Sequence, residues 1–206
     1  LKTPITAISG YAELLETGMA DESHKEHFYQ EIRKNSDRLL TLINDIIRLS
    51  ELDRSEKEPS FEEIDLYKIA MESMETLTVS ATQRNVELSL EGSQAMMVGN
   101  RDMVKELIEN LVQNAIRYNN DGGKVSVIVK KENRAVLVVR DNGIGIPAAE
   151  QQRVFERFYR VDKSRSKATG GTGLGLAIVK HIVEIHEAEI ELDSAPGVGT
   201  TISVYF

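Results

Sequence analysis

Four glycines crowd into the eight residues from Thr169 to Leu176, and apolar helix formers follow them at once. Glycine lets the backbone adopt positive φ and approach a ligand closely. A helix expected from about residue 173 to residue 186 would direct its free N–H groups and the positive end of its dipole at this loop. The segment predicts a phosphate-binding loop, although an ordinary turn with a helix cap also explains an isolated glycine cluster.

Two familiar glycine motifs are excluded. A Walker A loop needs Lys and then Ser or Thr after its last glycine, whereas Leu176 and Ala177 follow Gly175. The run from Gly143 to Ala148 matches the dinucleotide pattern G-x-G-x-x-A after an expected strand. No βαβ unit follows it, however, because the next strand signal lies about forty residues further on.

A polar row accompanies the apolar periodicity of the stretch 102–118. Glu106, Asn110 and Asn114 recur at every fourth position and so lie on one face of the expected helix. Arg117 and Tyr118 close the stretch. Helices that only build a core rarely carry such a row, so this helix is a candidate part of a binding site, with a solvated helix end as the alternative for its last two residues.

Two more polar features follow along the chain. Asp141 ends an expected strand at 135–140 and precedes Gly143 and Gly145. An aromatic and charged segment, Phe155-Glu-Arg-Phe158, then leads to the glycine-rich loop. One ligand would explain all four features together.

The first fifty residues predict a helical hairpin. Residues 4–19 and 23–52 are amphipathic, and Ile32, Leu39 and Ile46 belong to a near-heptad seam in the second stretch. Two helices bury such a stripe poorly, so we expect a second hairpin to complete a dimeric four-helix bundle, or else the rest of the chain to cover it. A charged segment with Pro59 places the domain boundary near residue 57, giving domains 1–56 and 57–206.

The second domain mixes strands and helices without strict alternation. Strands are expected at 61–65, 86–90, 95–98, 124–129, 135–140, 189–193 and 200–206, and helices at 66–84, 102–118 and 173–186. The pairs 124–140 and 189–206 indicate antiparallel hairpins. The fold class predicted is α/β: a two-layer sandwich with an antiparallel-rich sheet and helices on one face.

Composition narrows the class of protein. The chain has 206 residues, a net charge of −8 and no cysteine. These values argue against a nucleic-acid partner and a disulfide framework, and no apolar run is long enough to span a bilayer. Because the first residue is Leu1 rather than Met, we expect a fragment of a longer protein, and no signal-peptide pattern is visible.

The order and separation of the four features closely resemble the catalytic and ATP-binding domain of sensor histidine kinases, whose boxes are named N, G1, F and G2. Lys2-Thr3-Pro4 resembles the tail of that family's H box. The resemblance covers nearly the whole chain. It implies an ATP-dependent protein-histidine kinase that uses Mg²⁺, and a homodimer that passes its phosphoryl group to a response-regulator receiver domain.

The resemblance also implies roles for residues. Asp141 would accept the adenine amino group in a pocket that includes Gly143, Gly145 and Ile146. Asn110 and Asn114 would ligate Mg²⁺, Arg117 would contact phosphate and Tyr118 would border the nucleotide. The segment 159–172 would be a lid, with Arg160 and Lys163 as candidate phosphate contacts, although a solvated position suits Lys163 equally well. The remaining nucleotide contacts would come from Gly170, Gly171, Thr172, Gly173, Leu174 and Gly175.

The chain departs from the family's pattern at its start. The phosphoacceptor histidine would lie two residues before Leu1, so the fragment alone is expected to be inactive in autophosphorylation. Thr3 matches the threonine that the family uses in dephosphorylating its partner. The chain's own histidines read as surface or packing residues: His24, His27, His181 and His186. His186 precedes Glu and Ala, where the family often has two glycines.

The expected localisation is cytoplasmic, with the parent protein in the bacterial cell membrane through segments outside this sequence. Two other functions stay open at this point. One is another ATPase of the same superfamily, which Lys2-Thr3-Pro4 and the hairpin argue against. The other is a dimerising module that binds nucleotide without kinase activity.

Overall fold

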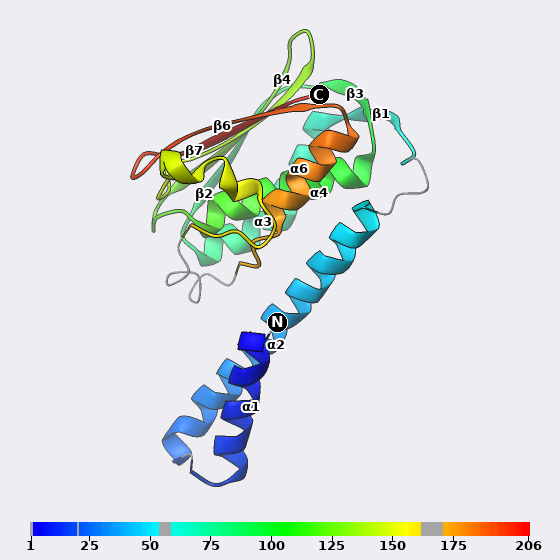
Figure 1. Ribbon diagram of the computed structural model, residues 1–206. Helices are drawn as coiled ribbons and strands as arrows, with labels where there is room; N and C mark the ends of the chain where they lie inside the picture. Colours follow the sequence, from blue (N-terminus) through cyan, green and yellow to red (C-terminus); the bar gives the residue numbers. More distant parts are fainter. Residues whose placement is uncertain (1, 20, 54–58, 162–170) are drawn as a thin grey trace. The chain divides into compact units, whose positions relative to one another are not determined.

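The computed structural model describes residues 2–19, 21–53, 59–161 and 171–206. The chain forms two compact units, one of residues 1–54 with 170–172 and the other of residues 55–169 with 173–206. The first is a helical hairpin and the second is an α/β fold (Figure 1). The boundary expected near residue 57 lies outside the described residues.

The helical unit consists of α1 (Lys2–Glu16) and α2 (Glu22–Asp53). Pro4 lies in the first turn of α1, where a missing N–H costs no intrahelical hydrogen bond. The Tyr11 and Phe28 rings pack across the two helices with centroids 5.3 Å apart. The hairpin predicted from the apolar seam is therefore present.

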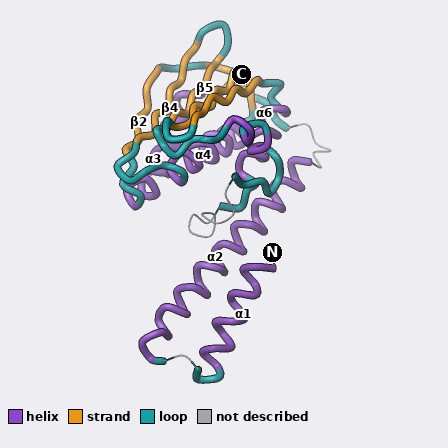
Figure 2. The backbone as a smooth tube through the Cα atoms, turned by 60° about the vertical axis from the view of Figure 1, so that its left-hand side comes forward, coloured by secondary structure: helices purple, strands orange, loops and turns teal. Residues whose placement is uncertain are grey.

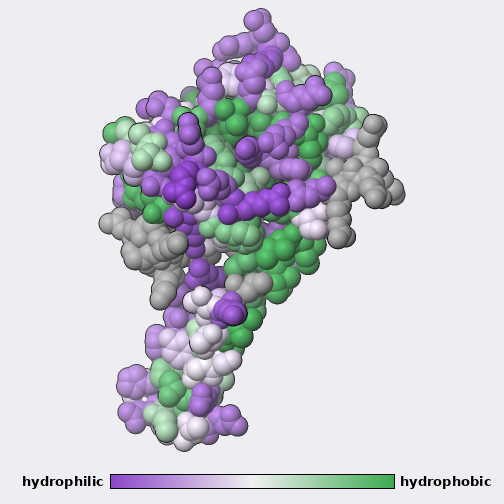
Figure 3. All heavy atoms as spheres, viewed as in Figure 1, coloured by the Kyte–Doolittle hydropathy of each residue, from purple (hydrophilic) through white to green (hydrophobic). Residues whose placement is uncertain are grey.

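Large apolar side chains remain exposed on α2. Leu40 is 59% exposed and Ile47 is 52% exposed. Figure 3 shows apolar residues along this helical unit in green. One hairpin thus leaves part of its apolar surface in contact with solvent, as the width of the stripe predicted.

The α/β unit contains a five-stranded sheet with the strand order β2-β4-β5-β7-β6. β2 runs parallel to β4, and every other neighbouring pair is antiparallel. A separate pair, β1 and β3, is antiparallel. The strands are β1 (Glu62–Asp65), β2 (Glu87–Gly92), β3 (Met96–Gly99), β4 (Lys124–Lys131), β5 (Ala135–Asp141), β6 (Glu189–Ala195) and β7 (Gly199–Tyr205).

Three helices cover one face of this sheet: α3 (Leu66–Gln83), α4 (Arg101–Arg117) and α6 (Gly175–Ile185) (Figures 1 and 2). Alternate residues of β4 point into this layer, because Val125, Val127 and Val129 are buried. They share the core with apolar residues of α4 such as Leu107 and Leu111. Each such side chain contributes about 1.5–3 kcal/mol by leaving water.

Two polar side chains fix the starts of these helices. The Asp65 carboxylate accepts hydrogen bonds from the backbone N–H groups of Tyr67 and Ala95, both at 3.1 Å. The Asn100 side chain accepts from the Met103 N–H at 3.0 Å. Both are N-caps of the kind that stabilises a helix by about 1 kcal/mol, so α4, which carries the polar row, starts at a defined residue.

The fold class predicted from the sequence is confirmed. The stretch 148–158, which is amphipathic, contains two short 3₁₀ turns, η1 (Ala148–Glu150) and η2 (Arg153–Phe155). Such turns recur as connectors because their hydrogen-bond geometry does not favour longer runs.

Candidate nucleotide-binding site

The polar row of α4 faces the start of α6. Asn110 Nδ2 donates a hydrogen bond to the Glu106 carbonyl at 2.9 Å. A Cβ placed on Gly175 would lie 2.7 Å from Asn110 Oδ1 and 3.7 Å from Asn114 Nδ2. The amide oxygen of Asn110 therefore points at the first residue of α6, and a side chain at position 175 would displace it.

The N-cap residue of α6 is apolar. Leu174 is the N-cap residue and its side chain, which is fully buried, forms no capping hydrogen bond. Gly173 precedes it with φ +76°, and its carbonyl accepts from the Phe158 N–H at 2.9 Å. Backbone N–H groups at a helix N-terminus can bind anions. This end of α6 therefore combines amide donors with the oxygen-bearing side chain of Asn110.

Asp141 lies at the end of β5, where its carboxylate is partly buried. Its Oδ1 accepts from the Gly143 N–H at 2.8 Å, and Asp141 pairs with Thr200 of β7. Burial raises the pKa of the Asp141 carboxyl above its usual value, and the backbone N–H groups of Gly143 and Thr200 oppose the increase. A partly desolvated carboxylate of this kind is a strong acceptor for a ligand N–H.

The loop after Asp141 packs against the end of α4. A Cβ on Gly143 would lie 2.4 Å from the Tyr118 carbonyl oxygen, so glycine is required for this approach. The same carbonyl accepts from the Ile144 N–H at 3.1 Å. Tyr118 itself is 37% exposed. The two ends of the site, Asp141 and the Asn110 row, are thus connected through one helix.

Two residues that the sequence analysis did not single out hold the far end of this loop. The Ile146 N–H donates to Ser194 Oγ at 2.8 Å. Gln151 Nε2 donates to the Ile146 carbonyl at 3.0 Å and to the Ser194 carbonyl at 2.7 Å. Gly145 approaches the same hairpin, because its Cβ would lie 1.9 Å from the Ala195 carbonyl oxygen. No local motif marks Ser194 or Gln151, since their contacts with each other and of Ser194 with Ile146 join positions far apart in the sequence.

Some of the remaining predicted residues lie beside these elements. Arg117 is half-buried at the end of α4, and its carbonyl accepts from Arg84 Nη1 at 3.3 Å. Arg160 is half-buried just after the Phe155–Phe158 segment. Phe158 is 57% exposed and has φ +63°. Packing against its described neighbours therefore covers less than half of this ring.

The other predicted residues fall elsewhere. Thr3 is exposed in the first turn of α1. Gly171 and Thr172 belong to the helical unit, where the Thr172 hydroxyl donates to the Asp45 carboxylate at 2.6 Å. Lys163 and Gly170, together with most of the expected lid, lie outside the described residues.

The donor set fits a nucleotide with a divalent cation. Amide oxygens such as Asn110 Oδ1 are hard ligands of the kind that Mg²⁺ binds. Within the described ranges, no group of three His, Cys, Asp or Glu side chains could hold a metal ion. A cation beside Asn110 would share its coordination with phosphate oxygens and water, as Mg²⁺ does in nucleotide complexes.

His186 connects α6 to the start of α4. Its Nε2 accepts from the Asn100 N–H at 3.0 Å, and Nδ1 lies 2.8 Å from the Ile182 carbonyl oxygen. This pairing requires the neutral ring with its proton on Nδ1. Burial lowers the pKa of His186, in agreement with the neutral form. His186 is therefore a packing residue, as expected, with an added hydrogen-bonding role at the cap of α4.

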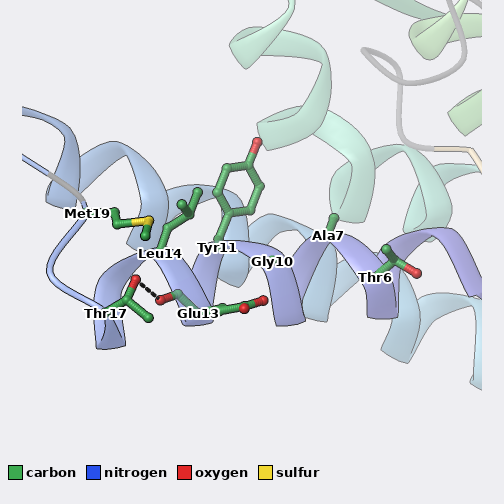
Figure 4. Close-up of a pocket in the computed structure, with 8 residues that line it drawn as sticks. All are labelled: Thr6, Ala7, Gly10, Tyr11, Glu13, Leu14, Thr17 and Met19. Atoms are coloured by element: carbon green, nitrogen blue, oxygen red, sulfur yellow. Dashed lines mark hydrogen bonds between the residues drawn. The ribbon is translucent and has the colours of Figure 1, made fainter.

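A groove of about 550 Å³ lies along α1 in the helical unit. Figure 4 shows its lining side chains on one face of the helix, with Met19 from the following loop. Thr17 Oγ1 donates to the Glu13 carbonyl at 2.8 Å beside it. The lining consists of Thr6, Ala7, Gly10, Tyr11, Glu13, Leu14, Thr17 and Met19.

Family models match both units. Residues 99–206 match the model described as histidine kinase-, DNA gyrase B-, and HSP90-like ATPase, and the chain belongs to this family. Residues 1–55 match the His Kinase A (phospho-acceptor) domain. Together the two domains identify the core of a two-component sensor histidine kinase.

Curated relatives and solved structures agree with this assignment. The sensor-like histidine kinase SenX3 of Mycolicibacterium smegmatis is 39% identical over 99% of this chain and 54% of its own length. The sensor protein kinase WalK of Staphylococcus aureus is 34% identical over 99% of this chain and 50% of its own length. The chain thus spans about half the length of these relatives. No helix among the described residues has the length and apolar character to span a membrane.

Among solved structures, the mycobacterial sensor histidine kinase MprB has a TM-score of 0.63 at 29% identity, covering 71% of this chain and 97% of that chain. The Acinetobacter baumannii histidine kinase AdeS has a TM-score of 0.78 at 20% identity, covering 100% and 95%. The histidine kinase ThkA in complex with response regulator protein TrrA gives the same score and identity, covering 100% and 57%. The last two show the fold alone.

Proposed function

We propose that the α/β unit binds Mg-ATP and transfers the γ-phosphoryl group to a histidine of the phospho-acceptor domain, which lies before Leu1 in the family's pattern. From there the group passes to an aspartate of a response-regulator receiver domain. The observation that carries the proposal is the convergence along α4. Its polar row meets the N-terminus of α6 at Gly175, and the carbonyl of its C-cap residue, Tyr118, meets the loop that follows Asp141.

Each part of this arrangement suits one part of the nucleotide. The Asp141 carboxylate accepts a hydrogen bond from the adenine amino group, with Gly143, Gly145 and Ile146 beside the base. Tyr118 borders the nucleotide at the end of α4. Phosphoryl transfer needs positioning and charge stabilisation more than covalent help from the protein, which is the kind of help that such a site offers.

The phosphate groups would lie at the other end of the site, beside the N-terminus of α6. Gly173, Leu174 and Gly175 offer backbone N–H groups to the phosphates. Gly170, Gly171 and Thr172 stay candidate contacts on the sequence pattern alone. Asn110 and Asn114 hold Mg²⁺, which when bound neutralises phosphate charge. Arg117, Arg160 and Lys163 supply positive charge to the phosphate oxygens.

The helical unit acts as a homodimer in this proposal. Leu40, Ile43 and Ile47 are at least 40% exposed on α2, and the groove on α1 provides a second apolar surface. Pairing two hairpins into a four-helix bundle would bury both surfaces. The match to the phospho-acceptor domain supports this state, and the ThkA complex, in which a kinase of the same fold is bound to a response regulator, supports the receiver domain as partner.

Thr3 has a second proposed role. It lies in the first turn of α1, where its side chain is exposed and would face a docked receiver domain. There it would position a water for dephosphorylating the receiver aspartate. For location, we propose that these two domains face the cytoplasm and that the parent protein sits in the bacterial cell membrane, since its relatives are sensor kinases of about twice this length.

Labelling of the complete protein with ATP that carries a radioactive γ-phosphate tests the activity. We expect an acid-labile, base-stable phosphoprotein that loses its label to a receiver domain. Asn110→Ala should reduce labelling at least a hundredfold, because it removes a metal ligand. Ser203→Ala, which changes a hydroxyl on β7, is the control and should label normally. Label that survives acid, or that does not depend on Asn110, would refute the proposal.

A further inference from the structure

The loop that follows Asp141 is attached at its far end to the β6–β7 hairpin by side chains. Ser194 Oγ accepts from the Ile146 N–H at 2.8 Å, and Gln151 Nε2 donates to the Ile146 carbonyl at 3.0 Å. Both polar backbone groups of Ile146 are thus engaged. Gln151 also donates to the Ser194 carbonyl at 2.7 Å, so the two side chains support each other.

Contacts also lead from this point back to Asp141. The Ser194 hydroxyl donates to the Gly199 carbonyl at 2.8 Å and lies 2.9 Å from Thr200 Oγ1. Thr200 pairs with Asp141 across β7 and β5, and its backbone N–H favours the ionised form of the Asp141 carboxyl. The start and the end of the loop are therefore fixed to the same few residues of the hairpin.

Backbone packing leaves the loop little freedom to shift by itself. The Gly197 N–H donates to the Ile144 carbonyl at 2.8 Å. A Cβ on Gly145 would lie 1.9 Å from the Ala195 carbonyl oxygen, and a Cβ on Gly199 would lie 2.0 Å from the Asp141 carbonyl oxygen. At such distances a change in the hairpin is passed directly to the loop, and a change at Ser194 reaches Asp141.

We propose that Ser194 and Gln151 are positioning residues for base recognition, which hold the Asp141 carboxylate where it can accept the 6-amino group of adenine. The inference rests on the proposed function of Asp141. A hydrogen bond is lost when donor and acceptor separate by more than about 3.5 Å, so a small displacement of the loop removes it. Contacts to the phosphates and the cation come from α4 and α6, and they stay in place.

The test compares two nucleotides on the intact chain by calorimetry. One is Mg-ATP, and the other is the purine ribonucleoside triphosphate with hydrogen in place of the 6-amino group. Ser194→Ala should weaken ATP binding about tenfold, the scale of one charge-assisted hydrogen bond, and change binding of the analogue less than about twofold. Ser194→Thr keeps a hydroxyl and should retain most of the preference for ATP. Ser203→Ala is the matched control on the same hairpin and should bind as the wild type does.

Each outcome decides the matter. If the wild type prefers ATP and Ser194→Ala keeps the whole preference, this inference is wrong and the role of Asp141 stands. If the wild type shows no preference for ATP over the analogue, both are wrong. An equal loss for both nucleotides would indicate a merely structural role and also overturn the inference.

Two further measurements distinguish loss of the attachment from a folding defect of the variant. Gln151→Ala removes the other half of the attachment, from a segment outside the sheet. Like Ser194→Ala, it should reduce the ratio of the affinity for ATP to the affinity for the analogue. Amide hydrogen exchange without nucleotide should be faster at Ile146 in Ser194→Ala than in the wild type. Unchanged exchange at Ile146 together with an unchanged ratio in Gln151→Ala would overturn the proposal.

Discussion

At the scale of single residues, Asp141 combines burial with a need to stay ionised. Burial raises the pKa of its carboxyl, while the N–H groups of Gly143 and Thr200 favour the charged form. The folded carboxyl therefore binds a proton more readily than it does in the unfolded chain. Because the adenine amino group is a donor, the ionised carboxylate, which only accepts and does so more strongly, serves the proposed role better than the protonated carboxyl.

The pH dependence of ATP binding follows from this pKa. As pH falls through the raised pKa of Asp141, the carboxylate is protonated and ATP affinity should fall, at a higher pH than for an ordinary aspartate. The effect of Asp141 on folding stability has the opposite sign. Stability should increase as the pH falls, because a raised pKa means that the ionised carboxylate is unfavourable in the folded state and protonation removes this cost. Asp141→Asn should bind ATP weakly at every pH and be at least as stable at neutral pH.

Calorimetric titrations with ATP and urea unfolding curves, both from neutral to mildly acidic pH, check this prediction. The Asp193→Asn variant is the control, since it changes an exposed carboxylate on β6. ATP affinity in the wild type that stays constant over this range would contradict the assigned environment of Asp141.

At the scale of elements, α4 organises the site. Asn100 fixes its start, its polar row faces α6, and its end contacts the loop after Asp141. Its opposite face is buried with the sheet, so the row cannot rotate away without exposing the core. The helix thereby holds the proposed metal, phosphate and base contacts at set distances from one another.

Gly175→Ala tests the meeting of α4 and α6. Alanine favours a helix by about 1 kcal/mol over glycine, but its Cβ would lie 2.7 Å from Asn110 Oδ1 and displace that side chain. We expect folding stability close to that of the wild type and Mg-ATP affinity reduced at least fivefold. Thermal unfolding and ATP titration measure the two effects separately.

Gly10→Ala is the matched control in this experiment. Gly10 also lies in a helix, but a Cβ there would have nothing within 4 Å. It should raise stability slightly and leave ATP binding unchanged. Full Mg-ATP affinity in Gly175→Ala would show that Asn110 does not need its present position.

The sequence predicted the elements better than their assembly. Apolar periodicity revealed both helices of the hairpin and the alternation of β4, because these patterns are local. The parallel pairing of β2 with β4 could not be predicted, since no local residue determines a strand's partner. The 3₁₀ turns at 148–155 were also missed, because an amphipathic pattern does not distinguish them from a regular helix.

The same limit applies to the candidate site. Glycine clusters and the asparagine row are visible as motifs, and the structure brings Gly175 against Asn110. Ser194 and Gln151 carry no such signal. Their contacts join positions 48 and 43 residues apart, so only the folded hairpin reveals them.

At the scale of the whole molecule, the helical unit should control assembly. Leu40 and Ile47 are more than half exposed on α2, which is unusual for side chains of this size in an apolar seam. The double variant Leu40→Glu/Ile47→Glu should convert a dimer to a monomer, because two buried charges at each interface are costly. Light scattering of the 206-residue chain measures the change.

Nucleotide binding provides the internal control for that variant, and its ATP affinity should equal that of the wild type. Val79→Glu alters an apolar residue of α3 that is 65% exposed, and it should leave the dimer intact. A wild-type chain that is monomeric at tens of micromolar, or a dimer unaffected by the double substitution, would be inconsistent with a bundle formed by the hairpins.

The central claim is that the α/β unit binds ATP and recognises its base through Asp141. The most direct measurement is calorimetric titration of the intact chain with Mg-ATP and Mg-GTP, repeated with Asp141→Asn. The account predicts micromolar to millimolar binding of ATP, weaker binding of GTP by the wild type, and loss of at least tenfold in ATP affinity in the variant. No binding of ATP, or equal affinity for the two nucleotides in the wild type, would contradict it.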